Sequence, residues 1–338
     1  MARPRPAHGQ ALSPVRAPGR GVVLLSVLLI VALLSALAVR MTSRHSLIVA
    51  QARQVLGADV TLQYALGAED FVRQLLFEDW ERDTQPEKTD HLGDAWAQPL
   101  QPFELNEYED AFLEIQIRDL GACFNLNSLA GEEGTEHVRR LRALLQALSL
   151  PPNIADLWLD WVDADEQITG FGAEDGEYLL EPVAYRAANT MAADPSELFL
   201  LKGVDPQQIV ELLPHVCTLP TTELKINVNT ATVPVLASVD PESSNEGLRG
   251  LTEQERRYTT VEEATNDYQT DLLGGNAVLD VKSRYFELRA RVQIDDNVSE
   301  IASVLERNPE TGLLRLLHRD FGRAFVSLYE ADDAEDTN

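Results

Sequence analysis

The sequence predicts an α+β fold in which one long N-terminal helix packs on an antiparallel sheet, and a large all-α insertion interrupts that sheet. Three observations support this prediction. An uncharged apolar run occupies residues 21–39, and the chain contains no proline from there to Trp80. Residues 113–117 and 286–294 alternate apolar and polar side chains, as half-buried strands do. Between these two stretches, helical patterns extend over residues 125–280.

The apolar run lies between Arg20 and Arg40 and predicts a membrane-spanning segment over residues 22–40. At ~1.5 Å per residue, a helix of this length reaches ~28 Å, close to the ~30 Å hydrocarbon core of a bilayer. Residues 1–20 carry four arginines and no acid, so we expect a cytoplasmic N-terminus and a chain that continues across the membrane. A secretory signal peptide cleaved near residues 35–38 is the alternative, but its apolar core is usually only ~7–15 residues long.

Arg20, Gly21 and Val22 place a basic residue and a glycine directly before the apolar run. This junction resembles the leader of type IV pilin-like proteins, which prepilin peptidase cuts on the cytoplasmic side after the glycine. The resemblance implies a leader over residues 1–21 and cleavage between Gly21 and Val22. A plain, uncleaved anchor is the simpler alternative.

The chain is strongly acidic, with a formal net charge of −27 at pH 7. Removal of the leader would delete four arginines and no acid, which gives −31 for the mature chain. Such a charge repels nucleic acid and anionic lipid, and it suits basic partners or divalent cations. We expect the acidic tail at residues 330–338 to be disordered.

The helix–sheet domain is predicted in two pieces, residues 41–122 and 281–329. In the first piece, apolar residues recur at helical spacing on one side of the chain, so the second half of the long helix needs a cover. Residues 83–106 are polar and contain proline, which is typical of a loop. In the second piece, strands at 301–307 and 313–318 flank a turn. An antiparallel sheet with one apolar face would cover the helix.

Two similar motifs open the two halves of the helical stretch. They are FNLNSL at residues 124–129 and INVNTA at residues 226–231. Ser128 and Thr230 stand in these motifs where a helix N-cap is expected. We interpret the similarity as a weak repeat of two small helical units.

The predicted insert spans residues 123–280, with units at about 123–222 and 223–280. Its cysteines, Cys123 and Cys217, are the only two in the chain. If they face an oxidising compartment they can pair, and closing so long a loop is worth ~4–5 kcal/mol in the chain-entropy model. The predicted topology favours the disulfide, and two separate buried thiols are the alternative.

An acidic segment over residues 156–181 contains the strongest candidate ligands for a metal ion. No Lys or Arg occurs from Ala143 to Tyr185. Carboxylate oxygens on a glycine-bearing loop suit calcium, which binds about six to eight oxygens. The spacing does not fit an EF-hand, and a solvated acidic helix face is the alternative. The candidate ligands are Asp163, Asp165, Glu174, Asp175 and Asn189.

The sequence lacks the motifs of common enzymes, so we expect a non-enzymatic protein. Its six histidines have no zinc-site spacing, and there is no nucleophile elbow, P-loop or dinucleotide-binding turn. A second hypothesis is a membrane-anchored helix-hairpin-helix protein for DNA binding or uptake, since residues 201–206 and 226–231 resemble such units. Lys202 is almost alone there, however, and phosphate binding depends on Lys and Arg. A type IV pilus minor pilin is the third hypothesis.

Several motifs follow one another in order along nearly the whole chain. After the arginine–glycine leader come ACFNLN (122–127), LWLDWVDADE (157–166), EDGEYL (174–179), YRAAN (185–189), SELFLLKGV (196–204), VCTLP (216–220) and INVNTA (226–231). Together they resemble the family of type II secretion minor pseudopilin K, also called general secretion pathway protein K.

This resemblance implies a pilin-like helix-and-sheet domain with a SAM-like or helix-hairpin-helix-like insert. It implies a Cys123–Cys217 disulfide, structural calcium in the insert, and methylation of Val22 after cleavage by prepilin peptidase. It also implies a single-pass protein of a Gram-negative inner membrane, with the bulk of the chain in the periplasm. Such a protein would cap the tip of the pseudopilus with the minor pseudopilins I and J, initiate the filament, and aid export of folded proteins across the outer membrane.

The fifth residue of the mature chain would be Ser26, where most pilin-like subunits carry a glutamate thought to neutralise the neighbouring amino terminus. A carboxylate in apolar surroundings is costly unless it is paired. A subunit with no neighbour ahead of it should lack that acid, so Ser26 fits a tip subunit. A small residue merely tolerated in a membrane helix is the alternative. We expect partner helices to pack near Ser26 and on the apolar positions Leu47, Ile48 and Val55.

Overall fold

The structure is a computed structural model that describes residues 20–83, 88–105, 108, 111–239, 256–267, 277–323 and 325. Residues 1–19 of the predicted leader and the predicted acidic tail lie outside this part. The chain divides into two compact units, Met1–Gly57 and Ala58–Asn338, and the division falls within the first helix.

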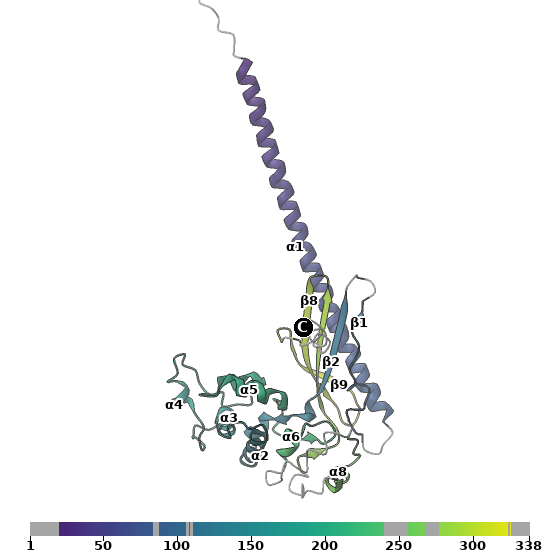
Figure 1. The fold of residues 1–338 in the computed structure, drawn as a ribbon, viewed down its shortest axis with the longest axis vertical. Helices are drawn as coiled ribbons and strands as arrows, with labels where there is room; N and C mark the ends of the chain where they lie inside the picture. The colour runs from purple at the N-terminus through teal and green to yellow at the C-terminus, as the bar shows by residue number, and fades with distance from the viewer. Residues whose placement is uncertain are drawn as a thin grey trace, which may run out of the picture. The chain divides into compact units, whose positions relative to one another are not determined.

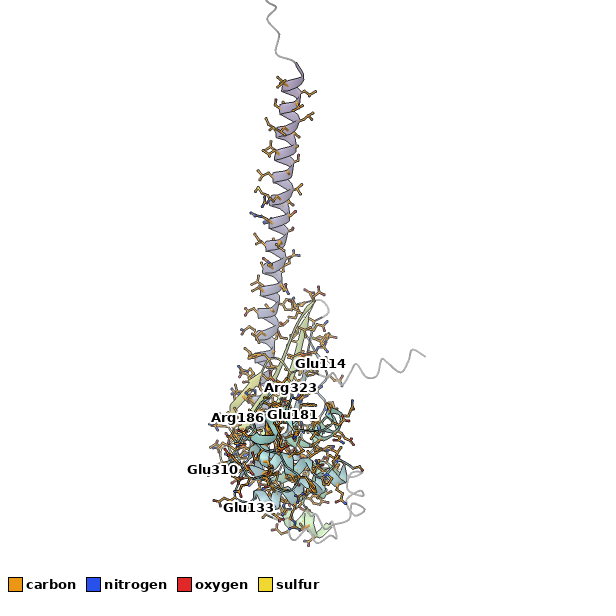
Figure 2. All side chains as sticks on the ribbon, turned by 90° about the vertical axis from the view of Figure 1, so that its left-hand side faces the viewer. Glu114, Glu133, Glu181, Arg186, Glu310 and Arg323 are labelled. Atoms are coloured by element: carbon orange, nitrogen blue, oxygen red, sulfur yellow. A yellow bond between two sulfur atoms is a disulfide. The ribbon has the colours of Figure 1, made fainter. Side chains whose placement is uncertain are left out.

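The described part of the first unit is helical throughout. Helix α1 (Arg20–Arg82) is 63 residues long and begins in this unit. From Val22 to Leu56 every residue is exposed, and Figure 2 shows side chains projecting on all sides of this stretch. By length and composition, the helix could cross a membrane near its N-terminus. The prediction of one long N-terminal helix, apolar in its first part, is therefore confirmed.

The second unit contains a five-stranded antiparallel sheet in the order β1-β2-β7-β8-β9 (Figure 1). The strands are β1 (Phe103–Glu104), β2 (Phe112–Asp119), β7 (Tyr285–Ile294), β8 (Asn297–Arg307) and β9 (Leu314–Asp320). The alternating patterns therefore predicted the main strands correctly. At the β8–β9 turn, Gly312 has φ +71° and lies so close to the Trp80 ring that a Cβ would overlap it.

The C-terminal part of α1 packs on one face of this sheet. Its buried residues Ala65, Ala68, Val72 and Leu76 recur every three or four positions and form one core with apolar residues of β7 and β8. Glu69 lies on the same face and is compensated, because its carboxylate accepts hydrogen bonds from Ser303 and Arg319, each at 2.9 Å. The sheet is thus the cover that the one-sided helix requires.

The helical insert connects β2 to β7 and has its own apolar core, formed by buried residues between Phe124 and Leu279. Its helices are α2 (Gly134–Ala147), α3 (Ile154–Val162), α4 (Asp175–Tyr178), α5 (Pro206–Leu212), α6 (Val233–Ala237) and α8 (Val261–Asp267). Short 3-10 helices are η1 (Leu120–Ala122), η2 (Leu126–Ala130), η3 (Pro195–Leu200) and η4 (Leu213–His215). Two parallel strand pairs complete it: β3 (Phe124–Asn125) with β4 (Val216–Cys217), and β5 (Ile226–Asn227) with β6 (Leu279–Asp280). The exact domain boundaries stay a prediction.

The two similar motifs of the insert fold alike. In each, the first asparagine accepts a hydrogen bond from the backbone N–H two residues later: Asn125 from Asn127 at 3.2 Å, and Asn227 from Asn229 at 3.0 Å. The second asparagine then bonds backbone groups far along the chain. Asn127 accepts from the Ala192 N–H, and Asn229 bonds both backbone groups of Tyr258. The two motifs therefore share the same asparagine-stabilised turn.

The two expected N-caps are wrong. Ser128 lies inside η2, and Asn125 is the residue that caps this 3-10 helix. Thr230 donates its hydroxyl hydrogen to Asp119 at 2.5 Å instead of capping a helix. The Thr230 hydroxyl therefore makes a long-range contact, which a local sequence pattern does not reveal.

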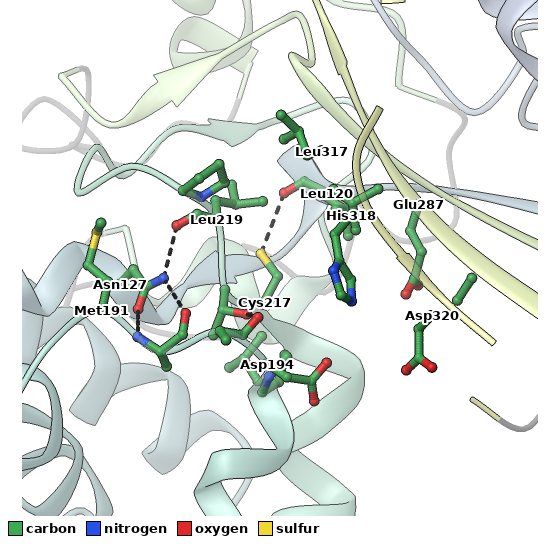
Figure 3. Close-up of a pocket in the computed structure, with 18 of the residues that line it drawn as sticks. Leu120, Asn127, Met191, Asp194, Cys217, Leu219, Glu287, Leu317, His318 and Asp320 are labelled. Atoms are coloured by element: carbon green, nitrogen blue, oxygen red, sulfur yellow. Dashed lines mark hydrogen bonds between the residues drawn. The ribbon is translucent and has the colours of Figure 1, made fainter. Parts of the chain in front are cut away.

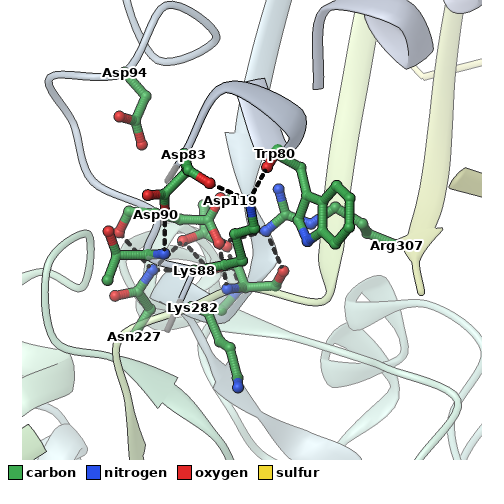
Figure 4. Close-up of polar contacts among 12 residues, drawn as sticks. Trp80, Asp83, Lys88, Asp90, Asp94, Asp119, Asn227, Lys282 and Arg307 are labelled. Carbon is green, nitrogen blue, oxygen red and sulfur yellow. Dashed lines mark hydrogen bonds and ion pairs between the residues drawn. The ribbon is translucent and has the colours of Figure 1, made fainter. Parts of the chain in front are cut away.

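A disulfide joins Cys123 to Cys217, as the sequence and the resemblance predicted. Beside it, a buried polar network links the insert to the sheet (Figure 4). The Asp119 carboxylate, at the end of β2, accepts a hydrogen bond from the Ser283 hydroxyl at 2.6 Å, and Asn227 donates to the Asp90 carbonyl at 3.0 Å. Burial raises the pKa of Asp119 to about 6, against the lowering effect of its hydroxyl donors.

Candidate functional site

Three of the predicted metal ligands lie together in the insert. Helix α3 ends at Val162, Asp163 caps its C-terminus, and the following loop leads to Glu174 at the start of α4. One carboxylate oxygen from each of Asp163, Asp165 and Glu174 lies within 4.8 Å of the others. A single cation could therefore contact all three side chains.

Several oxygens at this site lack a hydrogen-bond donor among the residues that the structure describes. Glu174 is only 4% exposed, yet neither of its carboxylate oxygens accepts a hydrogen bond. Asp163 Oδ1 and Asn189 Oδ1 are in the same condition. A buried acceptor without a partner costs roughly 1–3 kcal/mol. The donor set consists of oxygen atoms alone, so the residues fit a hard cation such as calcium.

Negative charge accumulates at the cluster. Burial raises the pKa of Glu174 to about 7, and the charges of Asp160 and Asp163 add to this rise. Burial, followed by the charge of Asp165, also raises the pKa of Asp163. A bound divalent cation would reverse both shifts, because it favours the ionised carboxylates.

Two acids of α3 hold the loop in place, although the sequence pattern did not single them out. The carboxylate of Asp160 accepts a hydrogen bond from the Thr169 N–H at 3.1 Å. Asp156 accepts one from the Phe171 N–H at 3.1 Å and pairs with Arg142. Their i, i+4 spacing on α3 is the signal that could have identified them, since it places both side chains on one face.

Two glycines allow the loop to approach these acids. Gly170 has φ +58°, and a Cβ there would lie 2.5 Å from Asp156 Oδ2. A Cβ at Gly172 would overlap Asp160 Oδ2. Any larger residue at either position would displace the carboxylates that hold the loop.

Asp175, a fourth predicted ligand, lies outside this group of three carboxylates. Its Oδ2 pairs with Arg186 at 2.6 Å, and its Oδ1 accepts a hydrogen bond from the Ala187 N–H at 3.0 Å. Asn189 adopts φ +47°, and its N–H donates to the Trp161 carbonyl at 2.9 Å. This bond tethers Asn189 to the end of α3 that carries Asp163, and its role as a ligand stays a prediction.

A second acidic cluster lies in the helix–sheet domain, and Figure 4 labels two of its members, Asp90 and Asp94. It consists of Asp79 on α1 together with Asp90 and Asp94, whose oxygens also lie within 4.8 Å of one another. Here one cation, Arg307, is part of the protein itself. Arg307 pairs with Asp90, and His91 Nδ1 lies 3.0 Å from Asp94 Oδ1. Burial raises the pKa of Asp79 to about 7, and the charges of Asp94 and Asp90 add to the rise.

A cavity of about 330 Å³ lies beside Cys217, between the insert and the sheet (Figure 3). Its charged lining includes Arg323, which pairs with Asp194 and with Glu287. Asn127 donates to the Leu219 carbonyl at 2.9 Å on the opposite wall. Because these charges compensate one another, we interpret the cavity as a structural junction.

The predicted sites on α1 are exposed. Leu47, Ile48 and Val55 are each at least 59% exposed. The Ser26 hydroxyl donates to the Val23 carbonyl at 2.9 Å, so its polar group is satisfied within the helix. Cleavage and methylation next to Gly21 stay predictions.

Similar proteins bear one name. The family described as type II secretion system (T2SS), protein K, matches residues 122–221. A protein named type II secretion system protein K from Pseudomonas aeruginosa is 34% identical, covering 90% of this chain and 93% of its own. One of the same name from Aeromonas hydrophila is 30% identical, covering 88% and 95%.

A solved structure gives the same result. It is the crystal structure of the GspK-GspI-GspJ complex from the type 2 secretion system of enterotoxigenic Escherichia coli. One of its chains superposes with a TM-score of 0.68 at 27% identity, covering 81% of this chain and 100% of that chain. The pilin-like α+β fold is confirmed, and the chain belongs to the type II secretion system protein K family.

Proposed function

We propose that this minor pseudopilin caps the tip of the type II secretion pseudopilus, where it initiates the filament and aids export of folded proteins across the outer membrane. The observation that carries the proposal is the likeness to a chain of the GspK-GspI-GspJ complex over that chain's whole length. By this analogy, the partners are the minor pseudopilins I and J, and the role is non-enzymatic. Co-purification of the three full-length proteins from a membrane extract tests the partnership, and a chain that purifies alone would contradict it.

The proposed topology is a single pass through the inner membrane of a Gram-negative bacterium, with the N-terminus in the cytoplasm and the bulk in the periplasm. Its support is the arginine-rich leader before an exposed apolar helix. Cysteine pairing agrees with this topology, because disulfides persist in oxidising compartments. Protease digestion of spheroplasts should remove the part after Arg40, and its protection would argue for the opposite orientation.

We further propose that prepilin peptidase cuts between Gly21 and Val22 and that Val22 is then methylated. Co-expression with the peptidase, followed by intact mass and terminal-peptide analysis, tests this directly. An N-methylated Val22 is the expected terminus. A terminus near Val39 would mean a signal peptide, and an intact Met1 would mean a plain anchor.

Ser26 and the exposed apolar positions of α1 fit assembly by helix packing. Leu47 is 59% exposed and lies in the Val22–Leu56 stretch of α1, where every residue is exposed. Leu47→Asp should reduce recovery of the complex with I and J about tenfold, since it places a charge in an apolar interface. Ser46→Asp is the matched control, because Ser46 lies about 100° around the helix from Leu47, in the direction away from Ile48 and Val55. Equal loss in both variants would refute the chosen face.

We propose that the insert binds structural calcium through Asp163, Asp165 and Glu174, with Asn189 as a further oxygen donor. The support is the group of buried oxygens without donors at this loop. Calcium would supply positive charge there and fix the loop against α3. Calorimetric titration of the full-length chain in neutral detergent, after chelation, should detect one class of sites. Asp163→Asn with Glu174→Gln should abolish the binding heat, whereas Asp175→Asn should preserve it.

DNA binding is the less favoured function. The chain carries 28 Lys and Arg against 55 Asp and Glu, which opposes a polyanion. The asparagines of the INVNTA motif bond the protein's own backbone, so they are committed to the fold. A gel-shift assay at low salt should detect no complex with duplex DNA.

A further inference from the structure

The chain has only four lysines, and three of them line one cavity. This cavity of about 380 Å³ lies at the junction between the insert and the helix–sheet domain. Its basic residues are Lys88, Lys225, Lys282, Arg284 and Arg307. The fourth lysine, Lys202, pairs with Glu177 elsewhere in the insert. The chain as a whole has a net charge of −27, so this cavity is a local concentration of positive side chains on an acidic protein. We call this cavity the lysine pocket.

Two of the lysines are positioned by backbone carbonyls. Lys88 Nζ donates to the carbonyls of Trp80 and Asp83 and lies 4.7 Å from the centre of the Trp80 ring. Lys225 Nζ donates to the Ala277 carbonyl at 2.6 Å. A carbonyl dipole orients an ammonium group without neutralising it, so both positive charges remain available to a ligand.

The third lysine differs from the arginines beside it. Arg284 bonds the Glu306 carboxylate at 2.6 Å, and Arg307 pairs with Asp90. Lys282 is exposed, and none of the described residues accepts a hydrogen bond from its Nζ, which extends away from the polar network in Figure 4. The lysines, rather than the arginines, therefore carry the charge that a ligand could neutralise.

Two acids in the same lining limit how much negative charge a ligand should bring. They are Glu223 and Asp280. Burial raises the pKa of Asp280, while the nearby charges of Lys282 and Lys225 lower it less. A ligand with one or two carboxylates balances this arrangement, whereas a polyanion would be repelled by both acids.

The remaining walls suit a side chain rather than a bare inorganic anion. The lining includes Trp80, Leu219, Tyr285 and Pro309, which offer apolar and aromatic surface beside the cations. The volume falls within the ~300–1,000 Å³ range of ligand sites, and mixed apolar and charged walls are typical of such sites. An anion without apolar groups would leave this surface uncovered.

We propose that the lysine pocket binds an acidic peptide segment of a partner protein. One or two carboxylates of the segment lie against Lys225 and Lys282, and a neighbouring apolar side chain packs on Trp80. This inference concerns a recognition site for an acidic partner and does not depend on the position of the protein in the filament.

Fluorescence anisotropy tests the proposal with the full-length chain in neutral detergent at low ionic strength. The probe is a rhodamine-labelled hexapeptide with two glutamates and one leucine, and its control peptide carries glutamine at both acidic positions. We expect binding of the acidic peptide and at least tenfold weaker binding of the control, with strong salt dependence.

A matched pair of double variants locates the binding site. Lys225→Gln with Lys282→Gln should weaken the acidic peptide about tenfold, because two charge contacts are lost. Lys202→Gln with Arg186→Gln removes the same charge outside the pocket and should leave affinity unchanged. All four side chains lie at or near the surface, so unchanged melting curves are expected for both variants.

Four results would overturn the proposal. They are no binding of the acidic peptide, equal binding of both peptides, equal weakening in both double variants, and full competition by inorganic phosphate at equal concentration. Deletion of residues 330–338 tests whether the chain's own acidic tail, and not a partner, occupies the pocket. If the peptide bound only after this deletion, the pocket would belong to the chain's own acidic tail and not to a partner.

Discussion

The insert and the helix–sheet domain each hold three acidic side chains close together, but the two clusters have different surroundings. In the part of the chain that the structure describes, no basic side chain pairs with Asp163, Asp165 or Glu174, and buried oxygens there lack donors. In the other cluster, Arg307 pairs with Asp90. The protein supplies a positive charge to the second cluster and, within the described residues, none to the first.

The difference shows why close carboxylates alone do not identify a metal site. Both clusters meet the same distance criterion, and burial raises the pKa of one acid to about 7 in each, Glu174 and Asp79. What separates them is whether the protein supplies positive charge. Substitutions in the two clusters should therefore have different effects.

Arg307→Met should destabilise the protein by about 3–5 kcal/mol, because it leaves the Asp90 carboxylate buried without a cation. Asp90 is 1% exposed and Arg307 4%, so water cannot replace the lost partner. Urea denaturation of the full-length chain, with calcium present, measures the change.

Arg315→Met is the control, since this arginine pairs with Glu306 but its side chain is 73% exposed. It should cost no more than about 1 kcal/mol. If both variants lost the same free energy of unfolding, the buried Arg307–Asp90 pair would be no more important than an exposed ion pair.

Glu174→Gln should weaken calcium binding about a hundredfold and make the calcium-free protein more stable at pH 8. The first effect follows from the loss of a charged ligand, worth about 2.7 kcal/mol at that ratio. The second follows because a buried carboxylate without donors becomes neutral. Thermal melts with calcium and with chelator measure both effects. Asp79→Asn is the control, and calcium should raise its melting temperature as much as it raises that of the unchanged protein.

Asp79→Asn should remove part of the pH dependence of stability. The pKa of Asp79 is about 7 in the folded protein against an ordinary 3.8, so the folded state holds the extra proton between these values. Stability contributed by this group is therefore present below pH 4 and is lost as the pH rises to 7. The variant should lose less stability over that interval, in urea titrations at saturating calcium. Parallel curves for both proteins would contradict the assigned pKa.

The smallest effect is expected for Asp175→Asn. Its carboxylate is committed to Arg186 and the Ala187 N–H, so calcium affinity should change less than twofold. Calorimetry measures this directly. A tenfold loss would restore Asp175 to the ligand set that the sequence predicted.

Much of the fold could be predicted because it depends on local periodicity. Alternation over residues 286–294 identified β7, and the one-sided apolar pattern of α1 required the sheet that covers it. The acidic segment of the insert was visible from composition alone. The disulfide could be predicted because the chain has only two cysteines and its predicted topology places them in an oxidising compartment.

What could not be predicted depends on contacts between distant residues. Arg307 and Asp90 are 217 positions apart, and no local pattern links them. Thr230 resembled a helix cap but donates to Asp119, 111 positions away. In both cases the contact that fixes the side chain comes from a segment far away in the sequence.

The insert leaves and re-enters the sheet at one place, because Asp119 at the end of β2 pairs with Phe286 near the start of β7. Tension along these strands would pass directly through the hydrogen-bond ladder between them, in shear. The whole insert is then a mechanical side branch that carries none of this load. A growing filament could thus push or pull on the helix and sheet without unfolding the insert, and the loop that carries Asp163 and Asp165 would be spared the stress of extension.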